Sequence, residues 1–227
     1  MPYTDDLSKM LRARKVIHVW GISAAVVSFI CAIDPEPISG TALVIFADTP
    51  LVTLCTIGMI FTLAVIYEQG NVLKDGFLMI ASIAAGMVLG ALGAKILGRL
   101  VPFLGTFNNA IITYGLHYAT GRAIIDFFSG GHKLADLKLK KLKEMAKKYK
   151  SEGKERGKQM VDVYKSMDAS DRDDLKKLNK EFRELSKKAH EKQKENKFDE
   201  YATINDQMMS IGEKMNLIFV KYGLTEN

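Results

Sequence analysis

The feature that most constrains this sequence is the uneven distribution of its charged residues. The first 130 residues contain 8 Lys and Arg and 8 Asp and Glu, whereas the last 97 contain 24 and 18 and carry the whole formal net charge of +6. The first part also contains four uncharged apolar stretches, at 16–33, 51–67, 76–94 and 100–121. One uniform globular domain is therefore excluded, and two cysteines in 227 residues exclude a disulfide-rich scaffold.

Each apolar stretch has about the length of a membrane span, because ~20 apolar residues cross ~30 Å of hydrocarbon. The expected fold is all-α, with a membrane-embedded helical domain over 1–130 and a charged cytoplasmic helical domain over 131–227. Lys and Arg lie just before the first stretch and just after the last, which places both termini in the cytoplasm under the positive-inside rule. Lys95 and Arg99 fit poorly in an outside loop. Two models therefore remain open: four spans, or two spans plus a re-entrant pair.

Two features of the apolar part suggest specific local roles. Gly86, Gly90 and Gly93 make the third stretch rich in small residues, which favours close packing of membrane helices within the chain or between subunits. Asp48 precedes Thr49-Pro50 at the start of an apolar run. Its carboxylate either caps that helix or belongs to an ion or proton relay.

Several of these residues also resemble a known family. The turns at Asp48-Thr49-Pro50 and Pro102-Phe103-Leu104-Gly105, with the run ATGRAIIDFF at 119–128, resemble an uncharacterised bacterial membrane domain. That domain occurs in YcjF-type proteins and appended to Era-like GTPases, and the resemblance covers roughly residues 30–130. It implies a bacterial inner-membrane module that works with a GTPase on another chain. It implies no catalytic residue.

The charged part begins with a basic amphipathic segment. Leucines alternate with lysines there, and a segment of this kind beside a membrane favours contact with anionic lipid. Gly153 and Gly157 are expected to interrupt or kink the helix that follows. Interspersed glutamates and few aromatic residues argue against nucleic acid as the partner. The basic residues expected to face lipid are Lys138, Lys140, Lys141 and Lys143.

The end of the chain contains two heptad-like apolar seams separated by a short polar turn. This pattern predicts an antiparallel helical hairpin near 170–222. Such a hairpin buries little by itself, so it is expected to pack on another subunit, on a partner, or on residues 134–167. The seam residues are Leu175, Leu178, Phe182 and Leu185 in the first helix, and Tyr201, Ile204, Met208 and Ile211 in the second.

The sequence lacks nucleotide-binding, metal-binding and nucleophile motifs, so no enzyme activity, cofactor or metal is expected. The predicted function is a non-enzymatic, oligomeric membrane scaffold or adaptor that contacts membrane lipids and holds a cytoplasmic protein partner or a second copy. The alternative is a pore, channel or holin-like permeabiliser. A channel would arrange five polar residues around one water-filled path, whereas a scaffold would bury them between helices. These residues are Asp48, Asn108, Asn109, Thr113 and His117.

Overall fold

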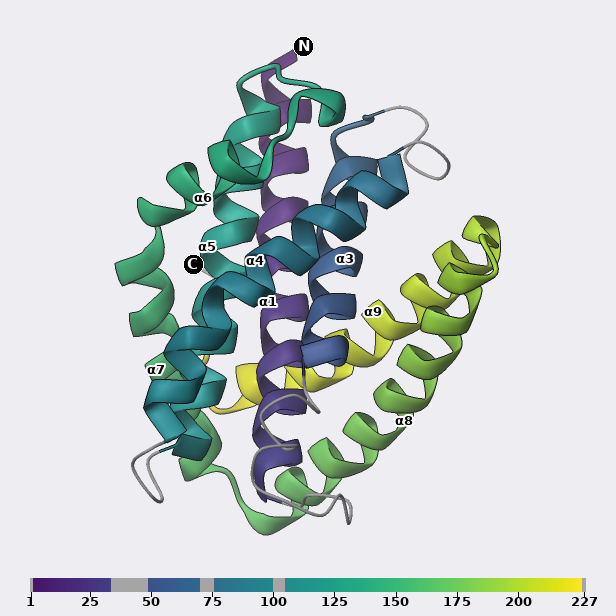
Figure 1. Ribbon diagram of the computed structural model, residues 1–227. Coiled ribbons are helices and arrows are strands. Elements are labelled where there is room, and N and C mark those ends of the chain that lie inside the picture. The colour runs from purple at the N-terminus through teal and green to yellow at the C-terminus, as the bar shows by residue number, and fades with distance from the viewer. Residues whose placement is uncertain (1, 34–48, 70–75, 100–104, 226–227) are drawn as a thin grey trace.

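The computed structural model describes residues 2–33, 49–69, 76–99 and 105–225 (Figure 1). The prediction of an all-α protein is confirmed over these residues, which form eight α-helices and a short 3-10 helix, Leu134–Asp136, with no strand. The α-helices are α1 (Pro2–Ile33), α3 (Thr49–Ile66), α4 (Phe77–Arg99), α5 (Gly105–Ser129), α6 (Leu139–Lys147), α7 (Lys150–Ser166), α8 (Ala169–Lys194) and α9 (Phe198–Lys221).

Helix α1 forms the centre of the bundle. It packs against α3, α5, α8 and α9, and every residue from 16 to 29 is buried (Figure 1). A helix that is apolar on all sides needs such surroundings, or a bilayer. Two helices, α1 over Leu7–Ile30 and α3, are long and apolar enough to cross a membrane, but most of each lies inside the bundle. The central helix of a soluble protein has the same length and hydropathy, so these two properties alone do not assign a span.

The third and fourth apolar stretches form α4 and α5. Helix α4 continues through Lys95 to Arg99, so these two residues belong to a helix and not to the short loop that the sequence suggested. The physical reason is that residues 94–99 contain only one glycine and no proline, so nothing in them stops the helix.

The two heptad seams lie on α8 and α9, which pair as an antiparallel hairpin. The connecting turn contains Asn196 in the left-handed region, with φ of 56°, a conformation that Asn tolerates well. The seam faces inward along both helices. Its buried members are Leu175, Phe182, Tyr201, Met208 and Ile211, and its half-buried members are Leu178, Leu185 and Ile204.

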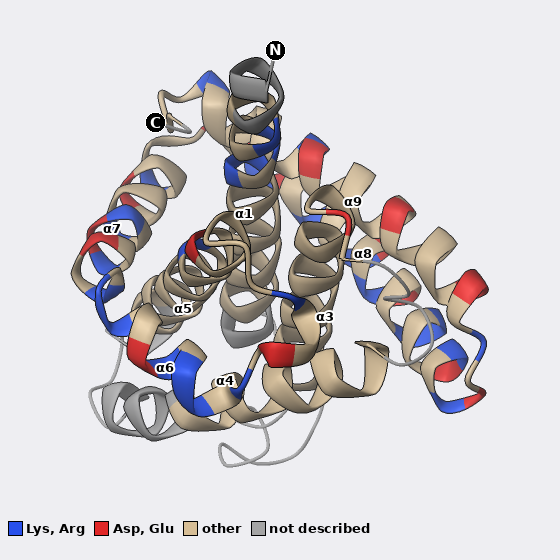
Figure 2. Cartoon of the chain, turned by 90° about the horizontal axis from the view of Figure 1, so that it is seen from above, with Lys and Arg blue, Asp and Glu red and all other residues tan. Residues whose placement is uncertain are grey.

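The hairpin packs on the apolar helices α1 and α3, which was not among the surfaces expected for it. The rings of Phe182 and Trp20 meet edge to face, with their centroids 6.2 Å apart. The ring centroid of Tyr201 lies 6.1 Å from that of Phe61 and 4.7 Å from that of Phe77. Most charged residues of α8 and α9 are exposed, and Figure 2 shows how many of them these two helices carry. The expected contact with residues 134–167 is present as well, between α9 and α7. The contact with α1 and α3 was missed because the apolar helices had been assigned to lipid, which left them unavailable as a packing surface.

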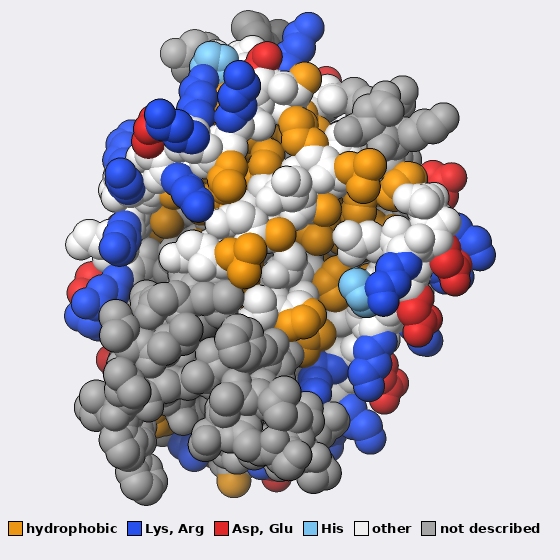
Figure 3. Space-filling model, in the orientation of Figure 1, with side chains coloured by type: hydrophobic (Ala, Val, Ile, Leu, Met, Phe, Trp, Pro, Cys, Tyr) orange, Lys and Arg blue, Asp and Glu red, His pale blue; other side chains and the backbone are white. Residues whose placement is uncertain are grey.

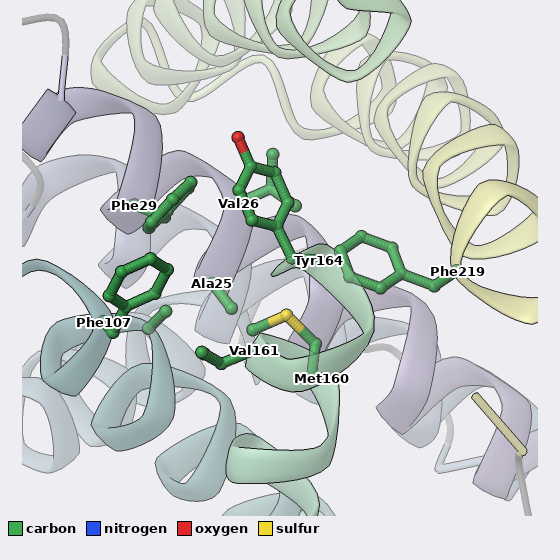
Figure 4. Close-up of a pocket in the computed structure, with 9 residues that line it drawn as sticks. Ala25, Val26, Phe29, Phe107, Met160, Val161, Tyr164 and Phe219 are labelled. Atoms are coloured by element: carbon green, nitrogen blue, oxygen red, sulfur yellow. The ribbon is translucent and has the colours of Figure 1, made fainter. Parts of the chain in front are cut away.

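Among the described residues, one hydrophobic core contains residues from both sides of position 130. Figure 4 shows one junction, where Val26 and Phe29 of α1 face Phe107 of α5, Tyr164 of α7 and Phe219 of α9. The rings of Phe29 and Tyr164 are 4.4 Å apart, and the space left between the side chains is only about 10 Å³. The change at residue 130 is therefore a change in surface charge and not the end of the core.

Glycines lie where the charged helices cross the apolar ones. A Cβ at Gly153 would lie 2.7 Å from the carbonyl oxygen of Gly115, and a Cβ at Gly157 would lie 2.7 Å from that of Ile111. The backbones of α7 and α5 are thus in direct contact. Helix α7 runs unbroken through both glycines, so the predicted interruption was wrong, while the alternative, a kink, stays a prediction. Both glycines permit the close approach of the two helices.

The carboxylate of Asp171 links α8 to the end of α9, beside α7. We therefore expect the free energy of unfolding to depend on pH. Asp171 accepts hydrogen bonds from Lys221 Nζ and Tyr222 Oη, both at 2.6 Å, and the Lys221 bond, followed by the Tyr222 bond, lowers the pKa of Asp171. Because the folded pKa is the lower one, this stabilisation is present above the unfolded pKa of ~3.9 and is lost as the pH falls through the folded value.

Asp171→Asn is therefore expected to lower the free energy of unfolding at pH 7, and the difference from wild type should shrink as the pH falls below the unfolded pKa of ~3.9. Urea unfolding at pH 7, 4 and 2.5 measures it. Asp174→Asn is the control, because Asp174 pairs with Lys177 on the exposed side of α8. A deficit of the Asp171 variant that stays constant down to pH 2.5 would contradict the assignment.

Candidate functional site

An open cavity of about 760 Å³ lies between α4, α5, α6 and α7. Its floor is formed largely by apolar side chains of α5, among them Ile112, Leu116 and Ala119, and Met87 of α4 completes it. Volumes of ~300–1,000 Å³ are typical of small-molecule sites. The size and the apolar floor both fit a ligand with a hydrophobic part.

Five lysines line one side of this cavity. They are spaced by 4, 3, 4 and 4 residues, and α6 and α7 are separated by only two residues, so the lysines share one side of a nearly continuous helical segment. Figure 3 shows Lys and Arg gathered along the edge formed by α6 and α7, beside the hydrophobic surface over α4. We call this set the lysine row: Lys143, Lys147, Lys150, Lys154 and Lys158.

The lysine row is largely uncompensated. Lys158 pairs with Glu155 at 2.7 Å, whereas the other four lysines form no ion pair with any residue that the structure describes. The described lining of the cavity also contains no carboxylate. Clustered cations repel one another, and an anion placed among them relieves that repulsion.

One polar group at the cavity lacks a partner. The hydroxyl of Thr120 is fully buried and has no hydrogen bond within the described part of the chain, although Thr120 belongs to the cavity lining. A buried hydroxyl without a partner costs free energy, so it favours a ligand oxygen that can complete its bonding.

Aromatic and charged side chains fix the helices that carry the lysine row. Tyr118 of α5 donates to Glu152 of α7, and Arg156 lies over the Tyr118 ring at 5.3 Å from its centroid. Tyr149, between α6 and α7, donates to Asp126 of α5. Arg122 lies over the rings of Tyr118 and Tyr149, 5.9 Å and 5.0 Å from their centroids.

Of the four lysines predicted to face lipid, the structure brings only Lys143 to the cavity. Lys141 lies over the ring of Phe127, 4.8 Å from its centroid, while Lys138 and Lys140 are exposed elsewhere. The sequence reasoning missed the remainder of the lysine row. The 4, 3, 4, 4 spacing was the available signal, but residues were chosen by their nearness to the last apolar stretch rather than by helical phase.

The small-residue stretch of α4 faces the charged part of the chain. A Cβ at Gly86 would collide with the side chain of Leu139 on α6, and one at Gly90 would lie 3.3 Å from Lys143 Nζ. The contacts of these two glycines are therefore intrachain contacts with α6. The surroundings of Gly93 lie outside the described residues.

The four residues of the family-like turns are only partly described. Pro50 is exposed in the first turn of α3, where its missing N–H costs nothing. Gly105 begins α5, but its surroundings are not described. Asp48 and Pro102 lie outside the described residues, so their predicted roles stay predictions.

Four of the five polar residues proposed for a channel lie on α5, and the fifth, Asp48, lies outside the described residues. His117 is buried and lies 3.2 Å from Thr56 Oγ1 of α3, and Thr113 donates to Ser28 of α1 at 3.2 Å. Asn109 is also fully buried, whereas Asn108 lines the cavity. The three buried residues thus lie between helices, apart from the open cavity.

The described part of the chain contains no group of three or more His, Cys, Asp or Glu side chains placed to hold a metal ion. Comparison with known proteins adds no assignment: no family model, curated protein or solved structure matches this chain.

Proposed function

We propose that the protein is a non-enzymatic membrane scaffold that binds the cytoplasmic face of an anionic bilayer and presents its α8–α9 hairpin to a protein partner or a second copy. The observation that carries the proposal is the surface of α4. Leu78 and Leu89 are 66% and 62% exposed on a helix with no charge between residues 76 and 94, and the lysine row lies beside it. An apolar face flanked by lysines suits a lipid interface.

The arrangement of the hairpin supports contact through α4 rather than through α1 or α3. Helices α8 and α9 cover part of α1 and α3, and most of their many charged residues are exposed (Figure 2). Charges in hydrocarbon are costly, so this side of the bundle is better placed in water. Both termini then remain in the cytoplasm. Full insertion of α1 and α3 would require the hairpin to leave them.

The buried polar residues of α5 favour a scaffold over a pore. Asn109, Thr113 and His117 are each enclosed by neighbouring helices, as a scaffold requires. A water-filled path would instead expose these groups along one wall.

Membrane binding is expected to depend on the two exposed leucines of α4. Leu78→Gln with Leu89→Gln should reduce binding to vesicles of phosphatidylcholine and phosphatidylglycerol by at least about tenfold, because ~1–2 kcal/mol of burial is lost per side chain. Cosedimentation of the full chain measures this. Leu217→Gln, a 67% exposed leucine of α9, is the matched control.

Two results would contradict the proposal. One is wild-type protein that ignores vesicles of every composition, and the other is equal loss in the Leu217 control. Alkaline carbonate extraction then separates the two forms of attachment. Release of the protein indicates surface binding through α4, whereas retention indicates insertion of α1 and α3.

A further inference from the structure

We infer that the cavity between α4, α5, α6 and α7 binds one anionic phospholipid molecule, with an acyl chain on the apolar floor and the phosphate at the lysine row. This inference rests on the proposed function and adds a specific lipid site to a general membrane contact. Its basis is the combination of three features in one place: the cavity of about 760 Å³, four lysines without a described ion-pair partner, and the unpartnered hydroxyl of Thr120.

The apolar floor calls for a hydrocarbon chain. Ile112 and Leu116 are half-buried aliphatic side chains of one face of α5, and Met87 lies opposite on α4. Covering them removes apolar surface from water, which is favourable at ~25 cal/mol per Å². The described lining contains no aromatic ring, so it offers no stacking platform for the bases of a single-stranded nucleic acid.

An extended acidic peptide fits the site less well. Its backbone N–H and C=O groups would need partners once buried. The cavity walls are helices, whose backbone groups are bonded internally, and Asn108 is the one side-chain amide in the described lining. An acyl chain has no such requirement.

The length of the lysine row favours a phospholipid over a free fatty acid. Lys143 to Lys154 spans eleven residues of almost continuous helix, or roughly 16 Å at ~1.5 Å per residue. The phosphate and ester oxygens of one phospholipid headgroup cover more of this length than the single carboxylate of a fatty acid does.

Native mass spectrometry of the full chain with dioleoylphosphatidylglycerol tests the inference. Wild type should form a one-to-one adduct, with dioleoylphosphatidylcholine and oleate giving much less. The triple variant with Lys147→Gln, Lys150→Gln and Lys154→Gln should bind the lipid with about a hundredfold lower affinity. The reason is that each lysine near an anionic lipid contributes roughly fivefold in affinity. The matched control removes the same charge from the exposed side of α8: Lys180→Gln, Lys187→Gln, Lys188→Gln.

A second variant tests the floor independently of charge. Leu116→Trp places a larger side chain at the cavity and should reduce the adduct at least about tenfold, while Leu217→Trp, on the exposed surface of α9, should leave it unchanged. Circular dichroism verifies that each variant has the wild-type helix content. If Leu116→Trp fails to fold, the half-buried Ile112→Gln takes its place.

The outcomes separate this inference from the proposed function. The lipid site is overturned if the wild type binds vesicles but forms no phosphatidylglycerol adduct. It is also overturned if the adduct is lost equally in the triple lysine variant of the cavity and in the triple lysine variant of α8. Both results leave the scaffold proposal standing. An adduct without vesicle binding overturns the scaffold proposal alone. Preferential binding of oleate, an acidic peptide or RNA at the same lysines also overturns the inference.

Discussion

Gly157→Ala is expected to lower the free energy of unfolding by about 1–3 kcal/mol, as overpacking of a close contact does. The expectation reverses the usual preference, because alanine is normally better than glycine within a helix by ~0.5–1 kcal/mol. The new Cβ would lie 2.7 Å from the carbonyl oxygen and 3.0 Å from the Cα of Ile111. Both atoms belong to the backbone of α5, so no side chain can rotate away, and α7 must shift.

Gly90→Ala provides the matched control, since it makes the same change in another helix. There the new Cβ would meet only the end of the Lys143 side chain, at 3.3 and 3.5 Å, and a flexible lysine can move aside. Gly90→Ala should therefore be neutral or stabilising by up to ~1 kcal/mol. Urea unfolding of both variants gives the comparison. If both change stability in the same direction and by the same amount, the contact between α5 and α7 is not as described.

The glycines show why local sequence patterns identified the helices but not their packing. The four apolar stretches and the two heptad seams each correspond to a helix, because periodicity and uncharged length are local properties of the chain. Gly153 and Gly157 were interpreted as interruptions, since glycine has a low helix propensity. Their contacts with Gly115 and Ile111, about 40 residues away, cannot be read from propensity.

The site was predictable only in part for a related reason. A basic surface beside the apolar helices was expected, and Lys143 belongs both to that expectation and to the cavity. The residues of α5 that form the floor, such as Leu116, lie in a stretch that was assigned to the membrane. Since α6 and α7 return along α5, charged and apolar segments that are separate in the sequence line one cavity.

A large effect on the free energy of unfolding is also expected where the α8–α9 hairpin packs on α1. Phe182 is fully buried on α8 and meets the edge of Trp20 at a centroid distance of 6.2 Å. Phe182→Ala should lower the free energy of unfolding by about 3–5 kcal/mol, because it removes buried apolar surface and leaves a cavity. The chain contains a single tryptophan, so its fluorescence reports on this contact directly.

In the folded Phe182→Ala variant, Trp20 should become more accessible to acrylamide, and its emission should shift to longer wavelength as water approaches the indole. Glu181→Ala is the control: it shortens the exposed neighbouring side chain of the same helix and should change neither property. Equal effects of the two substitutions would mean that the hairpin does not pack on α1. The apolar surface of α1 and α3 would then be free for lipid, and the four-span model would regain support over surface binding through α4.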